Sequence, residues 1–265
     1  MSKIIDFHAH IYPEKIVQKA TESVGFFYGV SMCHDGSVES LLKSGENASV
    51  DAFVVHSVAT VPHQVQSINN FISQTCIQYP EKIIGFGTLH PDMEHPEDEI
   101  DRCISLGLRG IKLHPDFQKF YMDSKKMEPI YDYTAQKNLP ILMHCGDYRY
   151  DYSHPRRLAA VLDKFPKLTI IAAHFGGWSI FDLAVEYLLH RNCYLDISSS
   201  IFMLGCQRTK ELILLYGADR ILWGTDFPMG DHAKELEWFR SFSLKKDDMD
   251  KILYKNAEKI LKISL

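Results

Sequence analysis

Long apolar runs, an excess of basic residues and paired cysteines are the features that this chain lacks. No stretch of its 265 residues approaches the roughly 18 apolar residues of a membrane span. The formal net charge of −5 argues against a nucleic-acid partner, which would require a basic surface. The six cysteines form no Cys-x-x-Cys pair, which excludes a zinc ribbon and a disulfide scaffold. We therefore expect no nucleic-acid or membrane partner, and a small-molecule substrate instead.

The chain also lacks targeting and linker signals. The N-terminus has no basic segment followed by an apolar run of the secretory type, so together with the unpaired thiols it predicts a cytoplasmic protein. No low-complexity or Pro/Gly/Ser-rich stretch divides the chain, which predicts one domain over residues 1–265. For the assembly a homodimer is the default expectation, because symmetric dimers are common among soluble enzymes.

What the sequence does contain is one unit repeated along its length. Each repeat is a mostly continuous apolar run, a loop and a segment with helical apolar spacing. The predicted strands are Ile4–Pro13, Ala52–Ser57, Ile83–Leu89, Leu108–His114, Pro140–Gly146, Leu168–His174, Cys193–Ser198 and Ile221–Asp226. Continuous apolar strands alternating with helices indicate a parallel sheet covered by helices. Eight repeats predict a single TIM-type (β/α)8 barrel, with a doubly wound open sheet as the alternative.

Two connections carry further local signals. Residues 13–36 are expected to be a long connection, whose segment Gly25–Gly29 is either a lid or aromatic packing on the barrel mouth. Ser37 is a predicted N-cap of a helix over about 37–47. Ser153, His154 and Pro155 are typical of the cap and first turn of a helix that runs to Phe165.

Polar residues able to bind metal or substrate stand where the predicted strands end. His8 and His10 alternate with Ala9, so both point to one side of the first strand and can reach one metal ion. The later strand-end residues are Lys112, His114, His144, His174 and Asp226. In a TIM-type barrel, the active-site groups lie at the carboxyl ends of the strands. His56, His63 and His90 also lie near strand ends, and we expect structural roles for them.

Several of these residues fall within motifs that resemble the amidohydrolase superfamily. The motifs are Asp6-Phe7-His8-Ala9-His10, Gly110-Ile111-Lys112-Leu113-His114-Pro115, Met143-His144-Cys145-Gly146, Ala173-His174-Phe175-Gly176-Gly177 and Trp223-Gly224-Thr225-Asp226-Phe227-Pro228. They are similar to the amidohydrolase-related (amidohydrolase 2) branch, which includes metal-dependent hydrolases and enzymes of the aminocarboxymuconate-semialdehyde decarboxylase type. The resemblance spans essentially the whole chain.

The resemblance implies a metal site and its chemistry. His8, His10, His144 and Asp226 would bind one divalent ion, expected to be zinc, and Asp226 would also transfer a proton. His174 would be the acid/base histidine beside it. Lys112 leaves two alternatives open: a free cation facing an anionic substrate, or a carboxylated bridge to a second metal ion. His114, Arg149 and Trp178 are further candidates for substrate binding.

Three functions remain open: two enzyme activities and a binding protein without catalytic activity. The main expectation is hydrolysis of a small, anionic amide, ester or lactone by a metal-activated water. The alternative is a metal-dependent, non-oxidative decarboxylase of an unsaturated or aromatic acid. A catalytically silent binding protein would be expected to have lost a ligand, and the sequence retains every one.

Overall fold

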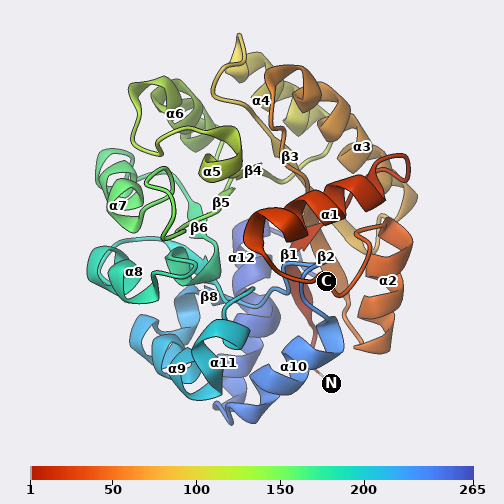
Figure 1. Ribbon diagram of the computed structural model, residues 1–265, viewed down its shortest axis with the longest axis vertical. Helices are drawn as coiled ribbons and strands as arrows, with labels where there is room; N and C mark the ends of the chain where they lie inside the picture. The colour runs from red at the N-terminus through yellow and green to blue at the C-terminus, as the bar shows by residue number, and fades with distance from the viewer. Residues whose placement is uncertain (1) are drawn as a thin grey trace. The chain divides into compact units, whose positions relative to one another are not determined.

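The computed structural model describes residues 2–265, in which eight strands alternate with helices (Figure 1). The strands are β1 (Ile5–His10), β2 (Ala52–His56), β3 (Ile83–Thr88), β4 (Gly110–Leu113), β5 (Ile141–Met143), β6 (Ile170–Ala172), β7 (Tyr194–Asp196) and β8 (Ile221–Leu222). They form one sheet in chain order. The Phe7 amide donates to the Trp223 carbonyl and Ala9 pairs with Phe227, so the last strand region joins the first. The fold is therefore the predicted TIM-type (β/α)8 barrel, and the open-sheet alternative is wrong.

Twelve α-helices connect and follow the strands in the described part of the chain. They are α1 (Val17–Tyr28), α2 (Val38–Asn47), α3 (Val65–Gln78), α4 (Pro96–Ser105), α5 (Pro115–Gln118), α6 (Glu128–Gln136), α7 (Pro155–Lys164), α8 (Phe181–Leu188), α9 (Ile201–Tyr216), α10 (His232–Ser241), α11 (Lys246–Asp250) and α12 (Asn256–Leu261). Among residues 2–265, none of the helices combines the length and apolar character that crossing a membrane requires.

The strands are buried on both faces, which is why their sequences are apolar without alternation. All five residues of β2 are buried, and so are all residues of β4, β5 and β6. Polar residues enter these strands only where they approach a carboxyl end, as His56 and Lys112 do. The burial pattern therefore separates an apolar core from a polar strand-end layer.

The structure differs from the sequence-based expectations at two connections. Residues Val17–Tyr28, which fall within the expected long connection, form the helix α1, whose C-cap Gly29 is in the left-handed conformation. The cap of α7 is His154, whose side chain accepts a hydrogen bond from the Arg156 amide, rather than Ser153. Ser37 is the predicted cap of α2, with its hydroxyl accepting from the Ser40 amide.

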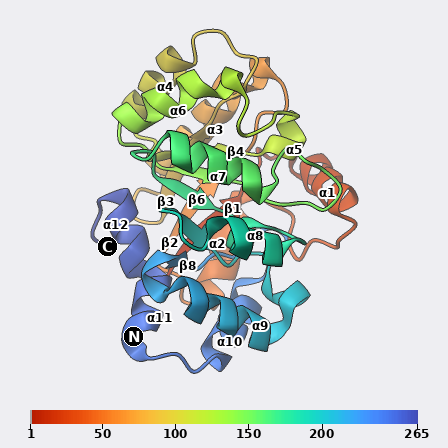
Figure 2. The same ribbon diagram turned by 90° about the vertical axis from the view of Figure 1, so that its left-hand side faces the viewer.

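The chain divides into two compact units, each with its own packing. The first contains the residues up to His56, Tyr79–Ile84 and Ile197–Leu265, and the second contains Ser57–Gln78 and Gly85–Asp196. In the first unit α10 packs against α2 and α9, and α12 contacts β8. In the second, α7 packs against α8 and α4 packs against α6 (Figures 1 and 2). The predicted site residues are divided between these units.

Candidate metal centre

Three predicted ligands meet in the first unit. His8 and His10 project from β1, and their Nε2 atoms are 3.3 Å apart. Asp226, which follows β8, places its Oδ1 atom 3.3 Å from each of these nitrogens. An ion bound at about 2.0–2.1 Å in tetrahedral geometry has ligand atoms about 3.3–3.4 Å apart. The three side chains therefore already have the spacing that one zinc-like ion requires.

The backbone presents these ligands in a restricted environment. The His8 side chain is fully buried, whereas His10 and Asp226 each retain 14% exposure, so the cluster has one open side. Asp226 has a φ of 57°, in the left-handed region that non-glycine residues seldom occupy. Its amide donates to the His8 carbonyl at 2.8 Å, which ties the two ligand-bearing segments together. A strained backbone held by such contacts is typical of functional sites.

Two serines that follow β7 orient the ligands. The Ser198 hydroxyl lies 3.1 Å from His8 Nδ1. With Nδ1 as the donor in this bond, His8 Nε2 carries the lone pair and faces Asp226. The Ser199 hydroxyl donates to Asp226 Oδ2 at 2.5 Å, which leaves Oδ1 beside the histidines. Neither serine was predicted as a site residue, because neither lies near a ligand in the chain.

Asp6 lies below the ligands and connects their two strands. Its Oδ1 atom accepts hydrogen bonds from the amides of His8 and Thr225, both at 3.0 Å. Its Oδ2 atom accepts from the Thr225 hydroxyl at 2.6 Å and lies 2.9 Å from His232 Nε2. Asp6 is completely buried. Asp6 therefore holds the backbone of His8 and that of Thr225, the residue before Asp226.

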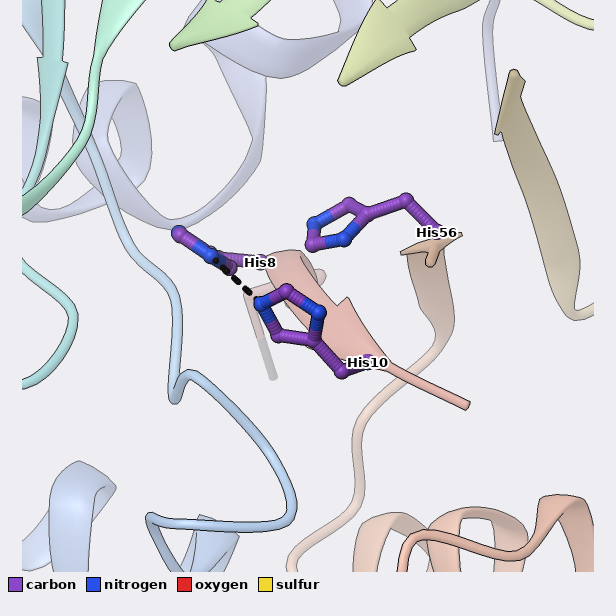
Figure 3. Close-up of side chains that lie close together, drawn as sticks. All are labelled: His8, His10 and His56. Atoms are coloured by element: carbon purple, nitrogen blue, oxygen red, sulfur yellow. Dashed lines mark hydrogen bonds between the residues drawn. The ribbon is translucent and has the colours of Figure 1, made fainter. Parts of the chain in front are cut away.

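His56 at the end of β2 also borders the cluster. Its ring centroid lies 4.3 Å from that of His10 and 4.9 Å from that of His8 (Figure 3). From the sequence, His56 was expected to have a structural role, since a single histidine at a strand end is a weak signal. The structure brings it beside both members of the His-x-His motif.

Tyr12 adds a phenol to the same unit. Desolvation of this side chain, and then the charge of Asp226, raise the pKa of Tyr12 well above its usual value. The phenol therefore stays protonated and can donate a hydrogen bond. Tyr12 was not predicted as a site residue, although it lies only two residues after His10.

In the second unit, His144 is part of a buried cluster with His114 and Asp116. The rings of His144 and His114 stack 3.9 Å apart with an angle of 7°. His144 Nε2 lies 2.9 Å from the Gly146 carbonyl oxygen and 3.5 Å from Asp116 Oδ2. Burial raises the pKa of Asp116 to about 7, although its hydrogen bond from Ser153 opposes the shift. His114 also caps α5, because its Nδ1 accepts from the Phe117 amide.

His174 and Lys112 are the other strand-end residues of the second unit. The His174 ring lies 5.0 Å from that of His144, and its amide donates to Asp196 Oδ1. His174 has a φ of 57°, so two predicted site residues, this one and Asp226, occupy the left-handed region. Lys112 is completely buried, which is unusual for a lysine.

Arg149 and Trp178 have partners within the second unit. The Arg149 guanidinium contacts the Asp147 carboxylate through Nε and Nη2, with the shortest distance 2.6 Å. The amide of Trp178 donates to the Cys145 carbonyl. Gly146 allows this contact, because a Cβ atom there would lie 2.4 Å from the Trp178 nitrogen. Arg149 is thus aligned by Asp147, while Trp178 is largely buried.

Comparison with known proteins finds related sequences and structures with the same fold. A gamma-resorcylate decarboxylase of Polaromonas sp. (strain JS666 / ATCC BAA-500) is 25% identical over 288 residues, covering 89% of this chain and 86% of that protein. A structure of an uncharacterized TIM-barrel protein from Bordetella bronchiseptica has a TM-score of 0.83 at 22% identity, covering 98% of both chains. A dihydroxybenzoic acid decarboxylase from Polaromonas sp. JS666, with bound manganese and the inhibitor 2-nitroresorcinol, has a TM-score of 0.76 at 19% identity, covering 99% of this chain and 97% of that one.

These names correct the main expectation from the sequence. Hydrolysis of an amide, ester or lactone was expected, with a hydrolase as the enzyme class. The relatives are decarboxylases instead, including several gamma-resorcylate decarboxylases and a 2-amino-3-carboxymuconate-6-semialdehyde decarboxylase from Caenorhabditis elegans. The hydrolase reading was wrong because both reactions use the same ligand motifs, so the motifs alone could not separate them. The alternative, a decarboxylase, has the better support.

The family assignment rests on nearly the whole chain. The model of the family described as Amidohydrolase matches residues 5–263, a range that includes His8, His10, His144, His174 and Asp226. This range agrees with the resemblance that the sequence motifs indicated. The chain belongs to the Amidohydrolase family.

Proposed function

We propose that this protein is a metal-dependent, non-oxidative decarboxylase of a hydroxy-substituted aromatic carboxylic acid. The observation that carries the proposal is the spacing of His8, His10 and Asp226, which suits one divalent ion in a chain whose relatives are named decarboxylases. Names of the relatives and of the structural neighbour, which refer to resorcylate and dihydroxybenzoate, indicate the substrate class.

The donor set restricts which ion fits. Imidazole nitrogen favours zinc, whereas carboxylate oxygen also suits manganese. Zinc is the ion expected from the sequence, and manganese is bound in the structural neighbour from Polaromonas. We propose one divalent ion, with zinc as the first to test. When bound, it supplies a Lewis acid that stabilises negative charge on the substrate.

The reaction requires a proton at the carbon that loses CO2. Cleavage of the carbon–carbon bond releases CO2 and leaves the electron pair on the ring, where one proton replaces the carboxylate. In the first unit, Ser198 and Ser199 orient His8 and Asp226, the proposed ligands of the metal ion. The protonated phenol of Tyr12 can donate a hydrogen bond to an oxygen of the substrate.

Several parts of the assignment are proposals from the sequence pattern. His144 is proposed as a further ligand, and His174 as the acid/base group that delivers the proton. Substrate contacts are proposed for Lys112, His114, Arg149 and Trp178, a set drawn from the strand ends and the loops that follow. A homodimer and a cytoplasmic location are likewise predictions. A second metal ion bridged by carboxylated Lys112 is the alternative to the single ion.

The test is product analysis with defined metal content. The full chain, stripped with a chelator and reloaded with zinc or manganese, is incubated with 2,6-dihydroxybenzoate and other hydroxybenzoates. Release of CO2 with formation of the matching phenol is expected only for the metal-loaded protein. No release of CO2 from any hydroxybenzoate by the metal-loaded protein would refute the proposal.

A matched pair of variants links this activity to the metal centre. Asp226→Asn removes a ligand charge and is expected to lower activity at least about 100-fold, since even partners behind the ligands contribute about 10- to 100-fold. Asp219→Asn makes the same chemical change at a side chain that is 78% exposed and pairs with Lys251. It should retain the activity of the parent chain.

A further inference from the structure

His56 is placed at the metal centre by strand register. In the parallel pair β1 and β2, His56 is the register partner of His10. The Ile11 amide donates to the His56 carbonyl at 3.2 Å, which fixes this alignment. Paired residues of adjacent strands project from the same face of a sheet. The His56 side chain therefore points to the side on which His10 lies.

The three imidazole rings are close enough to share one ion. The His56 ring is edge-on to both neighbours, at 89° to His10 and 67° to His8. One ring nitrogen from each of the three histidines can be chosen so that all lie within 4.8 Å of one another. Figure 3 shows the rings of His8, His10 and His56 grouped around the end of β1.

The three histidine rings lie in a buried environment beside one carboxylate. His8 and His56 are both completely buried, so their ring nitrogens have little access to water. Asp226 is the carboxylate that contacts His8 and His10 in the first unit. Three imidazoles beside one carboxylate suit a divalent cation, because each neutral ring contributes a lone pair without adding charge.

We propose that His56 is an additional ligand of the divalent ion held by His8, His10 and Asp226. The inference rests on the proposed function, because the ion is the one assigned to the decarboxylase. Ligation by His56 also predicts which divalent ion the centre prefers. An additional imidazole favours zinc over manganese, since manganese prefers oxygen ligands. His56 would then tune which ion the centre selects.

Two substitutions distinguish ligation from packing. His56→Phe keeps an aromatic ring for edge-to-face contact but has no nitrogen, and His56→Gln keeps a polar side chain of similar length. His63→Gln is the matched control, because His63 is an exposed histidine in the segment Pro62–Gln64. Circular dichroism of each metal-free variant establishes that it folds.

Each full-length protein is stripped of metal and titrated with zinc and with manganese against a competing chelator. Both His56 variants should raise the zinc Kd more than about 100-fold, beyond the range of residues that only support a ligand. The manganese Kd should change less, so that the preference for zinc narrows. His63→Gln should match the parent chain in both titrations.

A count of coordinated imidazoles decides the question. In the copper(II)-loaded proteins, electron spin echo modulation should show one imidazole fewer in each His56 variant than in the parent chain. An unchanged number of coordinated imidazoles in a folded His56 variant would overturn the role of His56 as a ligand. The decarboxylase proposal would remain intact. Failure of the parent chain to bind any of these metals would overturn both.

Discussion

Replacing Asp6 tests whether one buried carboxylate holds the two ligand-bearing segments together. Asp6 accepts four hydrogen bonds, two from backbone amides and two from the side chains of Thr225 and His232. Asp6→Ala removes all four acceptor contacts. The Thr225 hydroxyl can rotate to another acceptor, but the amides of His8 and Thr225 cannot.

The magnitude follows from these two amides. A buried donor left without an acceptor costs about 1–3 kcal/mol. Two such donors predict a loss of roughly 2–6 kcal/mol in the free energy of unfolding for Asp6→Ala. Asp6→Asn keeps one oxygen for both amides, and the Thr225 hydroxyl and the His232 ring can each reverse their donor role. Its expected loss is therefore smaller, about 1–2 kcal/mol.

The assay is urea unfolding of the metal-free chain, followed by zinc titration of the folded variants. Asp6→Ala should also weaken zinc binding about 10- to 100-fold, because His8 and the segment before Asp226 lose their common anchor. The control is Asp51→Ala, since exposed Asp51 accepts a hydrogen bond from the Ile4 amide at 2.8 Å, at the start of the same strand. If Asp6→Ala destabilises the chain no more than Asp51→Ala does, the reasoning is refuted.

Two further predictions concern stability alone. Burial, and then the charge of Asp6, raise the pKa of Glu235 from 4.5 to about 8. The folded state therefore holds a proton that the unfolded state releases, and the free energy of unfolding falls as the pH rises through this window. Glu235→Gln should flatten that decline by up to about 5 kcal/mol, since each pKa unit corresponds to about 1.4 kcal/mol. Urea unfolding at pH 5 and pH 9 checks this, and an unchanged pH profile contradicts it. Ser37→Ala removes the cap of α2 and should cost about 1 kcal/mol, measured as a lower thermal midpoint, whereas Ser37→Asn should retain stability.

Local patterns predicted most of the fold because most strands have a largely continuous apolar run, as in β2 and β5, whose residues are all buried. Apolar patterns did not predict the helix α1. Its buried residues are Thr21 and Gly25, so no apolar stripe identifies it as a helix. Gly25 lies against the Val30 carbonyl, where a Cβ atom would be 2.9 Å from the oxygen. A helix buried through small and polar residues is therefore invisible to hydrophobic periodicity.

The sequence by itself determined that His8 and His10 share a face and that Asp226 lies beyond the carboxyl end of a strand, because both facts depend only on local periodicity and approximate strand position. Tertiary structure decided which distant residues complete the cluster. The bond between Asp6 and His232 joins residues 226 positions apart, and the register of β1 and β2 brings His56 beside His10. Such pairings arise from strand register and chain closure, which no local pattern of residues specifies.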